Sequence, residues 1–305
     1  MSNAKVFNNL KIHTQYSICE GAIKIDDLAI YCKENKISNI GICDSLNLCG
    51  ALEFAEKVSK SGTHPIIGTQ INFSLENSIG KLALFASTAL GYKNLIKLSS
   101  KSYLDSDERT DPHCKIDELK NINDGLILLS GNHRGFFGKL FKLNKLKQIE
   151  EATKELKSIF KDKFYLEIQR HNEDGEENYE NFIIKLSETN QIPLIATQEI
   201  FYLKKEMHEA HDALTCIGRK DFMDNPNRLK FSDQHFVKKN DDIITLFNDI
   251  PEALENNFNF PYRFNFKPEK STPVLPTIKI EKNTTVESEL LAQAKTGLKN
   301  RLENY

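Results

Sequence analysis

The sequence predicts an α/β fold in which a parallel β-sheet closes into a barrel, and three observations support this. Short runs that are apolar on both faces alternate with longer amphipathic stretches between residues 8 and 218. Strands buried on both faces are typical of a parallel sheet that helices cover. More than six such strand–helix units occur, and no G-x-G-x-x-G follows the first strand, so a barrel is favoured over a doubly wound sheet.

The first half of the chain alternates predicted strands with predicted helices. In the first helix, residues 24–36, the apolar positions Ile25, Leu28, Ala29 and Cys32 have the spacing of one buried helix face. The strands of this half are predicted at residues 8–13, 37–43, 65–73 and 81–86. Its other helices are predicted at residues 49–61 and 91–103.

A polar, charged connection at residues 105–113 separates the two halves, after which the alternation resumes. The strands of the second half are again short apolar runs, predicted at residues 125–130, 164–169 and 193–197. Its helices are predicted at residues 137–160, 176–189 and 205–218.

The last third of the sequence changes character. Residues 222–266 are polar and broken by Asn-Pro and Phe-Pro pairs, and residues 267–276 contain three prolines, which is typical of a linker. Residues 288–302 form an amphipathic stripe typical of a helix. We therefore expect a barrel domain at residues 5–270, and at 271–305 a linker with the first, truncated helix of a following domain.

Composition excludes some classes of function. The 41 basic and 43 acidic residues leave a net charge of −2, which argues against nucleic-acid binding through the overall field. The longest apolar runs, 28–32 and 82–86, are far shorter than the ~20 residues of a membrane span. No secretory signal opens the chain, and the six cysteines show no C-x-x-C spacing. We expect a cytoplasmic protein with no membrane partner.

Several local patterns favour structural roles over catalytic ones. The spacing of Gly131, Gly135 and Gly138 matches neither G-x-G-x-x-G nor G-x-x-x-x-G-K-[ST], the two glycine patterns of nucleotide-binding loops. These glycines are therefore interpreted as a strand-to-helix turn. His208 and His211 lie three apart on a predicted helix without an H-E-x-x-H pattern, so they are interpreted as helix surface and core. Eight lysines between residues 139 and 163 alternate with glutamates, which indicates a solvated helix face, or alternatively a weak surface for nucleic acid or an acidic partner.

In a barrel of this kind, chemistry is expected at the carboxyl ends of the strands. Polar side chains follow the predicted strands at those points. They are His13, Asp44, Gln70, Asn132, residues 167–171 and residues 198–201.

Taken together, the strand-end segments resemble a known family. In matching order along nearly the whole chain, they are similar to the amino-terminal polymerase-and-histidinol-phosphatase (PHP) domain of bacterial DNA polymerase III alpha subunits. The resembling segments are K-I-H-T-Q-Y-S (11–17), C-D-S-L-N-L-C-G (43–50), P-I-I-G (65–68), G-Y-K-N-L (91–95), G-L-I-L-L-S-G (125–131), A-H-D-A-L (210–214) and D-I-P-E-A-L (249–254). The resemblance implies a distorted seven-stranded α/β barrel.

Active members of this family hold about three metal ions with His, Asp, Glu and Cys side chains and hydrolyse phosphoesters. By resemblance, only His13, Glu20 and Glu199 keep ligand chemistry at the matching positions. Family histidines are replaced by Lys11, Ser45, Lys81 and Phe201, a family Glu by Gln70, and a family Cys by Asn132. Because metal ions need several deprotonated ligands and the two ammonium groups repel cations, we expect no metal ion and no catalytic residue.

The resemblance implies the amino-terminal part of a chromosomal replicase: a structural scaffold and a docking platform for a separate proofreading exonuclease. The fragment itself is expected to need no cofactor and to have neither polymerase nor phosphoesterase activity. Magnesium, DNA contacts and DNA synthesis (a nucleotidyltransferase reaction) would belong to the remaining polymerase domains of the parent chain. The residues of the partner-binding surface are not indicated. The alternative is a divergent metal-dependent phosphoesterase or an intrinsic 3′–5′ proofreading nuclease, against which Lys11, Ser45, Lys81 and Phe201 argue.

Overall fold

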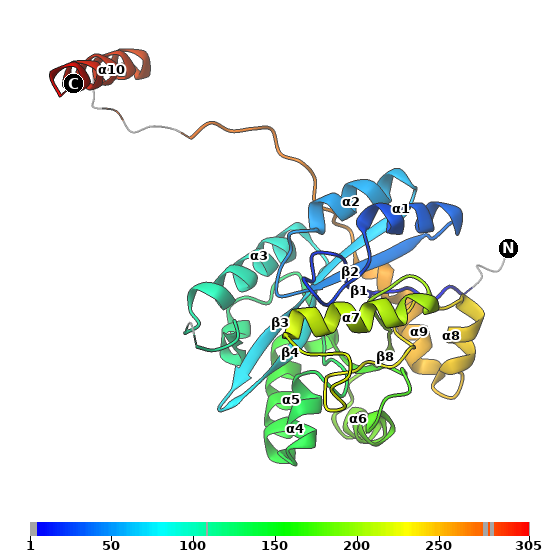
Figure 1. Ribbon diagram of the computed structural model, residues 1–305. Coiled ribbons are helices and arrows are strands. Elements are labelled where there is room, and N and C mark those ends of the chain that lie inside the picture. The colour runs from blue at the N-terminus through cyan, green and yellow to red at the C-terminus, as the bar shows by residue number, and fades with distance from the viewer. Residues whose placement is uncertain (1–4, 108, 277–279, 281–283, 305) are drawn as a thin grey trace. The chain divides into compact units, whose positions relative to one another are not determined.

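The computed structural model describes residues 5–107, 109–276, 280 and 284–304. The chain forms two compact units, residues 1–269 and 270–305. Unit 1 is an α/β barrel, which confirms the predicted fold class (Figure 1). In unit 2, α10 (Val286–Glu303) covers the predicted helix 288–302 and begins with a capping box between Thr285 and Ser288. Residues 277–279, 281–283 and 305 of the expected linker and helix lie outside the described residues.

The barrel wall is a seven-stranded sheet completed by a two-stranded pair. The sheet has the order β2-β3-β4-β6-β7-β8, with β5 against β3, and β1 pairs with β9. The strands are β1 (Lys11–Ile12), β2 (Asn39–Ser45), β3 (His64–Leu75), β4 (Ser78–Ala86), β5 (Cys114–Lys115), β6 (Leu126–Leu129), β7 (Phe164–Ile168), β8 (Leu194–Ala196) and β9 (Glu199–Ile200).

The ring of strands closes through the start of the chain. β9 follows β8 almost directly and lies parallel to β1, with Ile12 in register with Ile200. On the other side of β1, the Gly41 amide of β2 donates to the Asn9 carbonyl oxygen at 2.8 Å. Three hydrogen bonds of 2.8–3.0 Å join Asn8 to Asn257, and each connects the backbone of one residue with the side chain of the other. The two ends of unit 1 therefore meet at the closure.

The prediction of an entirely parallel sheet was wrong at β4. This strand runs antiparallel to both β3 and β6, and it forms a hairpin with β3 through Glu76 and Asn77. A parallel crossover needs about a dozen connecting residues or more, whereas the predicted strands 65–73 and 81–86 are separated by far fewer.

Helices pack around the outside of the barrel (Figure 1). They are α1 (Ile25–Glu34), α2 (Ala51–Lys60), α3 (Ala89–Leu104), α4 (Phe136–Lys142), α5 (Leu146–Phe160), α6 (Glu176–Asn190), α7 (His208–Arg219), α8 (Asn240–Leu246) and α9 (Pro251–Asn259). The predicted helix 137–160 is in fact two helices, because Asn144 takes a left-handed conformation between α4 and α5. The polar stretch 222–266 contains two short helices, α8 and α9. No helix among the described residues is long and apolar enough to cross a bilayer.

Alternating residues of each strand fill the barrel interior and the layer beneath the helices. On β6, Ile127 and Leu129 belong to the inner cluster, whereas Leu126 and Leu128 belong to the outer core. Phe260, from the segment after α9, joins the inner cluster and packs edge-on against Phe85. The interior is therefore a packed core, and the polar residues lie at the opposite, carboxyl ends of the strands.

Gly41 is required where the start of the chain crosses β2. A Cβ atom built at this position would lie 2.3 Å from the Leu10 carbonyl oxygen and 2.7 Å from its Cα. We expect Gly41→Ala to lower the free energy of unfolding by about 1–3 kcal/mol, because backbone must shift to admit the methyl group. Chemical denaturation measures this. Gly297→Ala, whose Cβ meets nothing within 4 Å, is the matched control, and equal midpoints for both variants would contradict the prediction.

Candidate functional site

The positions singled out by the sequence gather at the carboxyl ends of the strands, around a cavity of about 470 Å³. Seven of these positions line the cavity directly: Lys11, Glu20, Gln70, Lys81, Asn132, Glu199 and Phe201. Two more contact this set: His13 bonds to Glu199, and Ser45 accepts from Lys81. The structure thus brings together all nine positions.

Glu199 is the centre of the site. One of its oxygens lies 2.9 Å from His13 Nε2 and accepts from Gln70 Nε2 at 2.5 Å, and the other accepts from Asn132 Nδ2 at 2.7 Å. Lys11 Nζ lies 3.9 Å from the first oxygen. Burial by itself would raise the pKa of Glu199, but Lys11 and His13 hold it well below its usual value. Glu199 is therefore a carboxylate whose two oxygens already have partners.

Lys11 lies inside the barrel with two carboxylates as its counter-ions. Its Nζ is 3.1 Å from a Glu167 oxygen, and both side chains are almost completely inaccessible to solvent. Burial would lower the pKa of Lys11, but Glu167 and Glu199 raise it above the usual lysine value, so the ammonium stays charged. Glu167 also accepts from Gln169 Nε2 at 2.6 Å and from the Thr197 hydroxyl.

A second ammonium lies at the mouth of the cavity. Lys81 Nζ donates to Glu20 Oε1 and to Ser45 Oγ, each at 2.8 Å. Burial would raise the pKa of Glu20, but the charge of Lys81 lowers it below its usual value. Phe201 closes the site from the side, and the centroids of the Phe201 and His13 rings are 4.8 Å apart. Two of the three remaining ligand-type side chains, Glu20 and Glu199, are thus in contact with lysines.

The donor set can be compared with what a metal cluster of this family would need. Among the residues that the structure describes, no group of three or more His, Cys, Asp or Glu side chains is arranged to hold a metal ion. A divalent cation beside Glu199 or Glu20 would have to displace an ammonium from its carboxylate. The residues present therefore do not fit a multinuclear metal centre.

Asp44, another strand-end residue, stabilises a neighbouring loop. It accepts hydrogen bonds from the Thr14 amide at 2.6 Å and from the Thr14 and Ser17 hydroxyls at 2.7 Å. These bonds fix the turn that carries His13 and Glu20 into the site.

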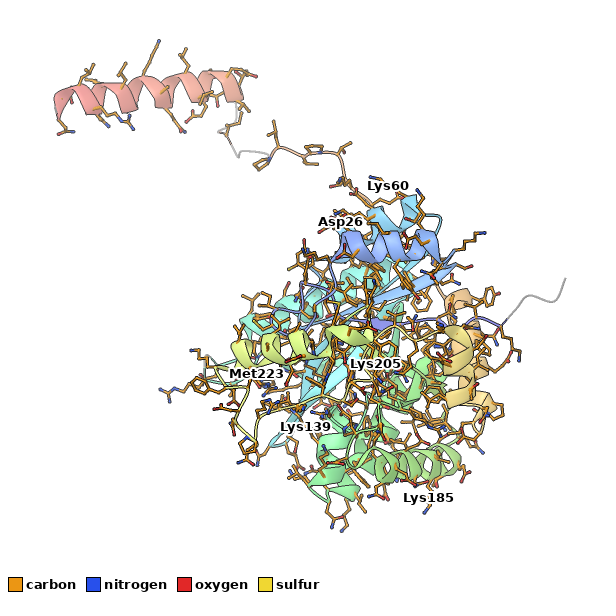
Figure 2. All side chains as sticks on the ribbon, turned by 45° about the vertical axis from the view of Figure 1, so that its right-hand side comes forward. Asp26, Lys60, Lys139, Lys185, Lys205 and Met223 are labelled. Atoms are coloured by element: carbon orange, nitrogen blue, oxygen red, sulfur yellow. The ribbon has the colours of Figure 1, made fainter. Side chains whose placement is uncertain are left out.

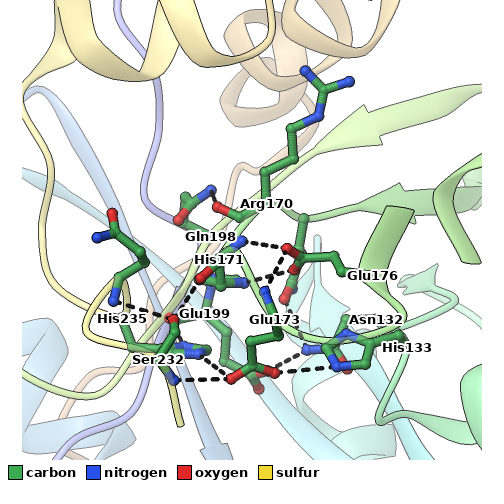
Figure 3. Close-up of polar contacts among 12 residues, drawn as sticks. Asn132, His133, Arg170, His171, Glu173, Glu176, Gln198, Glu199, Ser232 and His235 are labelled. Atoms are coloured by element: carbon green, nitrogen blue, oxygen red, sulfur yellow. Dashed lines mark hydrogen bonds and ion pairs between the residues drawn. The ribbon is translucent and has the colours of Figure 1, made fainter. Parts of the chain in front are cut away.

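A second polar cluster, which the sequence interpretation did not identify, lies beside the first (Figure 3). Its centre is Glu173, whose carboxylate contacts Nε2 of His133 and of His235 at 3.1 Å, Arg134 Nε at 2.6 Å and the Ser232 amide at 3.2 Å. Burial would raise the pKa of Glu173, but the hydrogen bonds from His133 and His235 lower it strongly. The cluster fastens segment 221–239 across the end of the barrel.

His171 connects the two clusters. Its ring stacks on that of His235 at 4.0 Å, and its Nε2 accepts from the Glu199 amide at 3.1 Å. The acceptor role means that the imidazole is neutral, with its proton on Nδ1, 3.4 Å from Glu176 Oε1. Burial lowers the pKa of His171 to about 3. The strand-end position of His171 was a usable sequence signal, whereas nothing in the sequence near His235 indicated this site.

Two other sequence interpretations can now be assessed. His211 is buried and its Nε2 bonds to the Glu20 carbonyl oxygen at 2.8 Å, so it helps to hold the mouth of the site. Lys139 and Lys142 are exposed, in agreement with the interpretation of a solvated helix face, and both also line the cavity.

Comparisons with known proteins give a consistent picture. Residues 9–171 match the model of the PHP domain family. Over 97% of its length the chain is 34% identical to the DNA polymerase III subunit alpha of Caulobacter vibrioides, covering 27% of that protein. It is likewise 34% identical to that of Rickettsia bellii, with 97% and 25% covered, and 32% identical to that of Borreliella burgdorferi, with 100% and 28% covered. The chain thus spans about a quarter of the length of these relatives.

Solved structures with related architecture include a putative metal-dependent phosphoesterase from Bifidobacterium adolescentis. It is 11% identical with a TM-score of 0.40, over 63% of this chain and 86% of that one. An amidohydrolase from Chromobacterium violaceum is 8% identical with a TM-score of 0.44, over 64% and 87%.

Proposed function

The chain belongs to the PHP domain family, and from this premise we propose that it is the PHP domain of a bacterial DNA polymerase III alpha subunit, acting there as a scaffold instead of a phosphoesterase. Relatives named DNA polymerase III subunit alpha align with nearly the whole chain, which supports the first part. Because it spans only about a quarter of them, DNA synthesis, its magnesium ions and the DNA contacts are assigned to other domains of such a subunit.

The observation that carries the scaffold role is the pair of ammonium groups in the site. Lys11 and Lys81 neutralise the carboxylates of Glu199 and Glu20, the side chains best suited to bind cations there. Hydrogen bonds from Gln70 and Asn132 take up the remaining acceptor positions of Glu199. A site held together in this way contributes to the stability of the barrel and leaves no ligand set free for metal catalysis.

We expect the purified chain to bind far less than one zinc or manganese ion per molecule and to hydrolyse neither a phosphate monoester nor the 3′ end of an oligonucleotide. The reason is that metal binding would require breaking two ion pairs. Elemental analysis after incubation with each metal, together with a phosphatase assay with and without chelator, measures this. Stoichiometric metal with activity that the chelator removes would favour the alternative, a divergent phosphoesterase or proofreading nuclease.

The partner proposed for the scaffold is a separate 3′–5′ proofreading exonuclease. Docking on the polymerase subunit would raise the concentration of the exonuclease at the primer end, a gain that arises from tethering alone. We expect isothermal titration calorimetry of this chain with the exonuclease of the same organism to show saturable one-to-one binding at about micromolar concentrations. An unrelated exonuclease is the control. No heat and no co-elution with the proper exonuclease would contradict the docking role.

A further inference from the structure

The cavity at the barrel mouth has an excess of positive charge. Six of its lining side chains are cationic: Lys11, Lys81, Arg134, Lys139, Lys142 and Arg219. Three are carboxylates: Glu20, Asp111 and Glu199. The site described above accounts for the first three cations, because Lys11, Lys81 and Arg134 form ion pairs with Glu167, Glu20 and Glu173.

The other three cations are available to a ligand. Within the ranges that the structure describes, Lys139, Lys142 and Arg219 have no carboxylate within ion-pair distance, and Lys139 donates only to the Ile79 carbonyl oxygen. Burial lowers the pKa of both Lys139 and Lys142, so an anion placed beside them would relieve an unfavourable environment.

A smaller cavity of about 230 Å³, lined in part by the apolar side chains of Ile18, Leu229 and Phe231, continues from this one. The two share five lining residues: Glu20, Lys81, Arg219, Leu229 and Phe231. Ile18, Cys19, Thr215 and Gly218 complete its wall, which is packed so closely that a Cβ on Gly218 would lie 2.3 Å from that of Cys19. The cavity is therefore preformed and of a size for one bulky side chain.

Exposed apolar side chains occur at Ile18, which lines this smaller cavity, and close in sequence to its lining residue Gly218. Ile18 is 83% exposed, and Ile217 and Phe222, at the end of α7 and just after it, are 72% and 75% exposed. In the view of Figure 2, Lys139 of α4 and Met223 are both labelled below α7. A groove with free cations at one end and an apolar rim at the other is complementary to a ligand with both kinds of group.

We infer that these two cavities form one groove, which binds an acidic peptide segment carrying a bulky apolar residue, presented by a protein partner. The carboxylates of such a segment pair with Lys139, Lys142 and Arg219, and its apolar side chain enters the smaller cavity. The identification of that partner with the proofreading exonuclease rests on the proposed function.

The chemistry favours a peptide over a nucleic acid. Asp111, for which no ion pair is found within the described residues, lies among the cations and would repel a continuous phosphodiester chain. A peptide can instead place carboxylates only where the cations lie, since residues of an extended chain are spaced by about 3.3 Å. A phosphate backbone also offers no apolar group to contact Ile18, Leu229 and Phe231 in the smaller cavity.

The probe for the test is a fluorescein-labelled acidic peptide in which glutamates flank a single leucine, followed by fluorescence polarisation on the full chain. We expect saturable binding that weakens at least about tenfold in Lys142→Glu/Arg219→Glu, as reversed charge contacts do, and by a smaller factor in Ile18→Ser. Because Lys142 and Arg219 are both exposed, we expect the double variant to fold, and circular dichroism checks this. The control, Lys33→Glu/Lys185→Glu, changes net charge equally at exposed positions of α1 and α6 and should bind normally.

No saturable binding of the peptide, equal binding by the groove and control variants, or tighter binding of oligothymidylate would overturn the groove. The exonuclease separates this outcome from failure of the proposed function. If it binds the unaltered chain and the groove variant equally, the groove inference fails and the docking role stands. If it does not bind the unaltered chain while the peptide does, the docking role fails and the groove stands.

Discussion

Replacing Lys11 with methionine should lower the free energy of unfolding by about 3–5 kcal/mol, the usual cost of leaving a buried charge without its partner. Without the ammonium, the Glu167 carboxylate, 3.1 Å from Nζ and inaccessible to solvent, loses its counter-ion inside the barrel. Glu199 loses its nearest full positive charge as well. Chemical denaturation followed by circular dichroism measures the change.

Two variants control this experiment. Lys11→Met/Glu167→Gln removes both charges of the pair and should recover part of the loss. Lys81→Met breaks the ion pair between Lys81 and Glu20, whose side chains are 32% and 27% exposed, respectively. This variant should lower the free energy of unfolding by no more than about 1 kcal/mol. A Lys11→Met protein within about 1 kcal/mol of the unaltered chain would show that the buried charge is not a major source of stability.

Stability should also fall steeply as the pH is lowered below 6.5, because His171 is held neutral in the folded chain. Its pKa drops from 6.5 to about 3, chiefly through burial and then through the neighbouring His235. A proton on Nε2 would face the Glu199 amide, which already donates to that nitrogen. Below pH 6.5, His171 therefore binds a proton in the unfolded chain but stays unprotonated in the folded chain.

The sign and size follow from proton linkage. A histidine whose folded pKa is depressed stabilises the fold above pH 6.5, and this contribution is lost as the pH falls toward 3. The slope is about 1.4 kcal/mol per pH unit, or on the order of 4–5 kcal/mol over the window. Between pH 6.5 and 5 the carboxyl groups with lowered pKa, such as Glu173 and Glu199, do not yet contribute.

Urea denaturation across this pH range tests the prediction. His171→Gln keeps an acceptor for the Glu199 amide but cannot titrate. The dependence of the free energy of unfolding on pH should therefore become less steep by about the amount that one bound proton contributes. His211, whose pKa is also lowered by burial, supplies part of what remains. An unchanged slope in His171→Gln would contradict the assignment.

The barrel could be predicted from the sequence because strands such as β6 are apolar on both faces and are separated by helices with one apolar stripe. The antiparallel direction of β4 was missed because an apolar run carries no mark of direction, and only the short connection indicated a hairpin. α9 was missed because it lies in a polar stretch, whereas the start of α8 is marked by Asp241 and Asp242 in its first turn.

The site could be located from the sequence because parallel strands bring their carboxyl ends to one edge. Its contacts could not. Lys11 and Glu167 are 156 positions apart, and the pairing depends on β1 and β7 reaching across the barrel interior. The Glu173 cluster depends on His235 and Ser232 in segment 221–239, which has no periodic pattern to place it.

The way the ring closes also sets the order in which the barrel can be completed during synthesis. Asn8 and Asn257 are 249 positions apart, so the hydrogen bonds that join the start of the chain to α9 cannot form until α9 has left the ribosome. At about 5–20 residues per second, these bonds form roughly 10–50 s after Asn8 has been synthesised. Until β9 has been synthesised, the edge of β1 that pairs with it is unpaired, and an unpaired strand edge can associate with other chains.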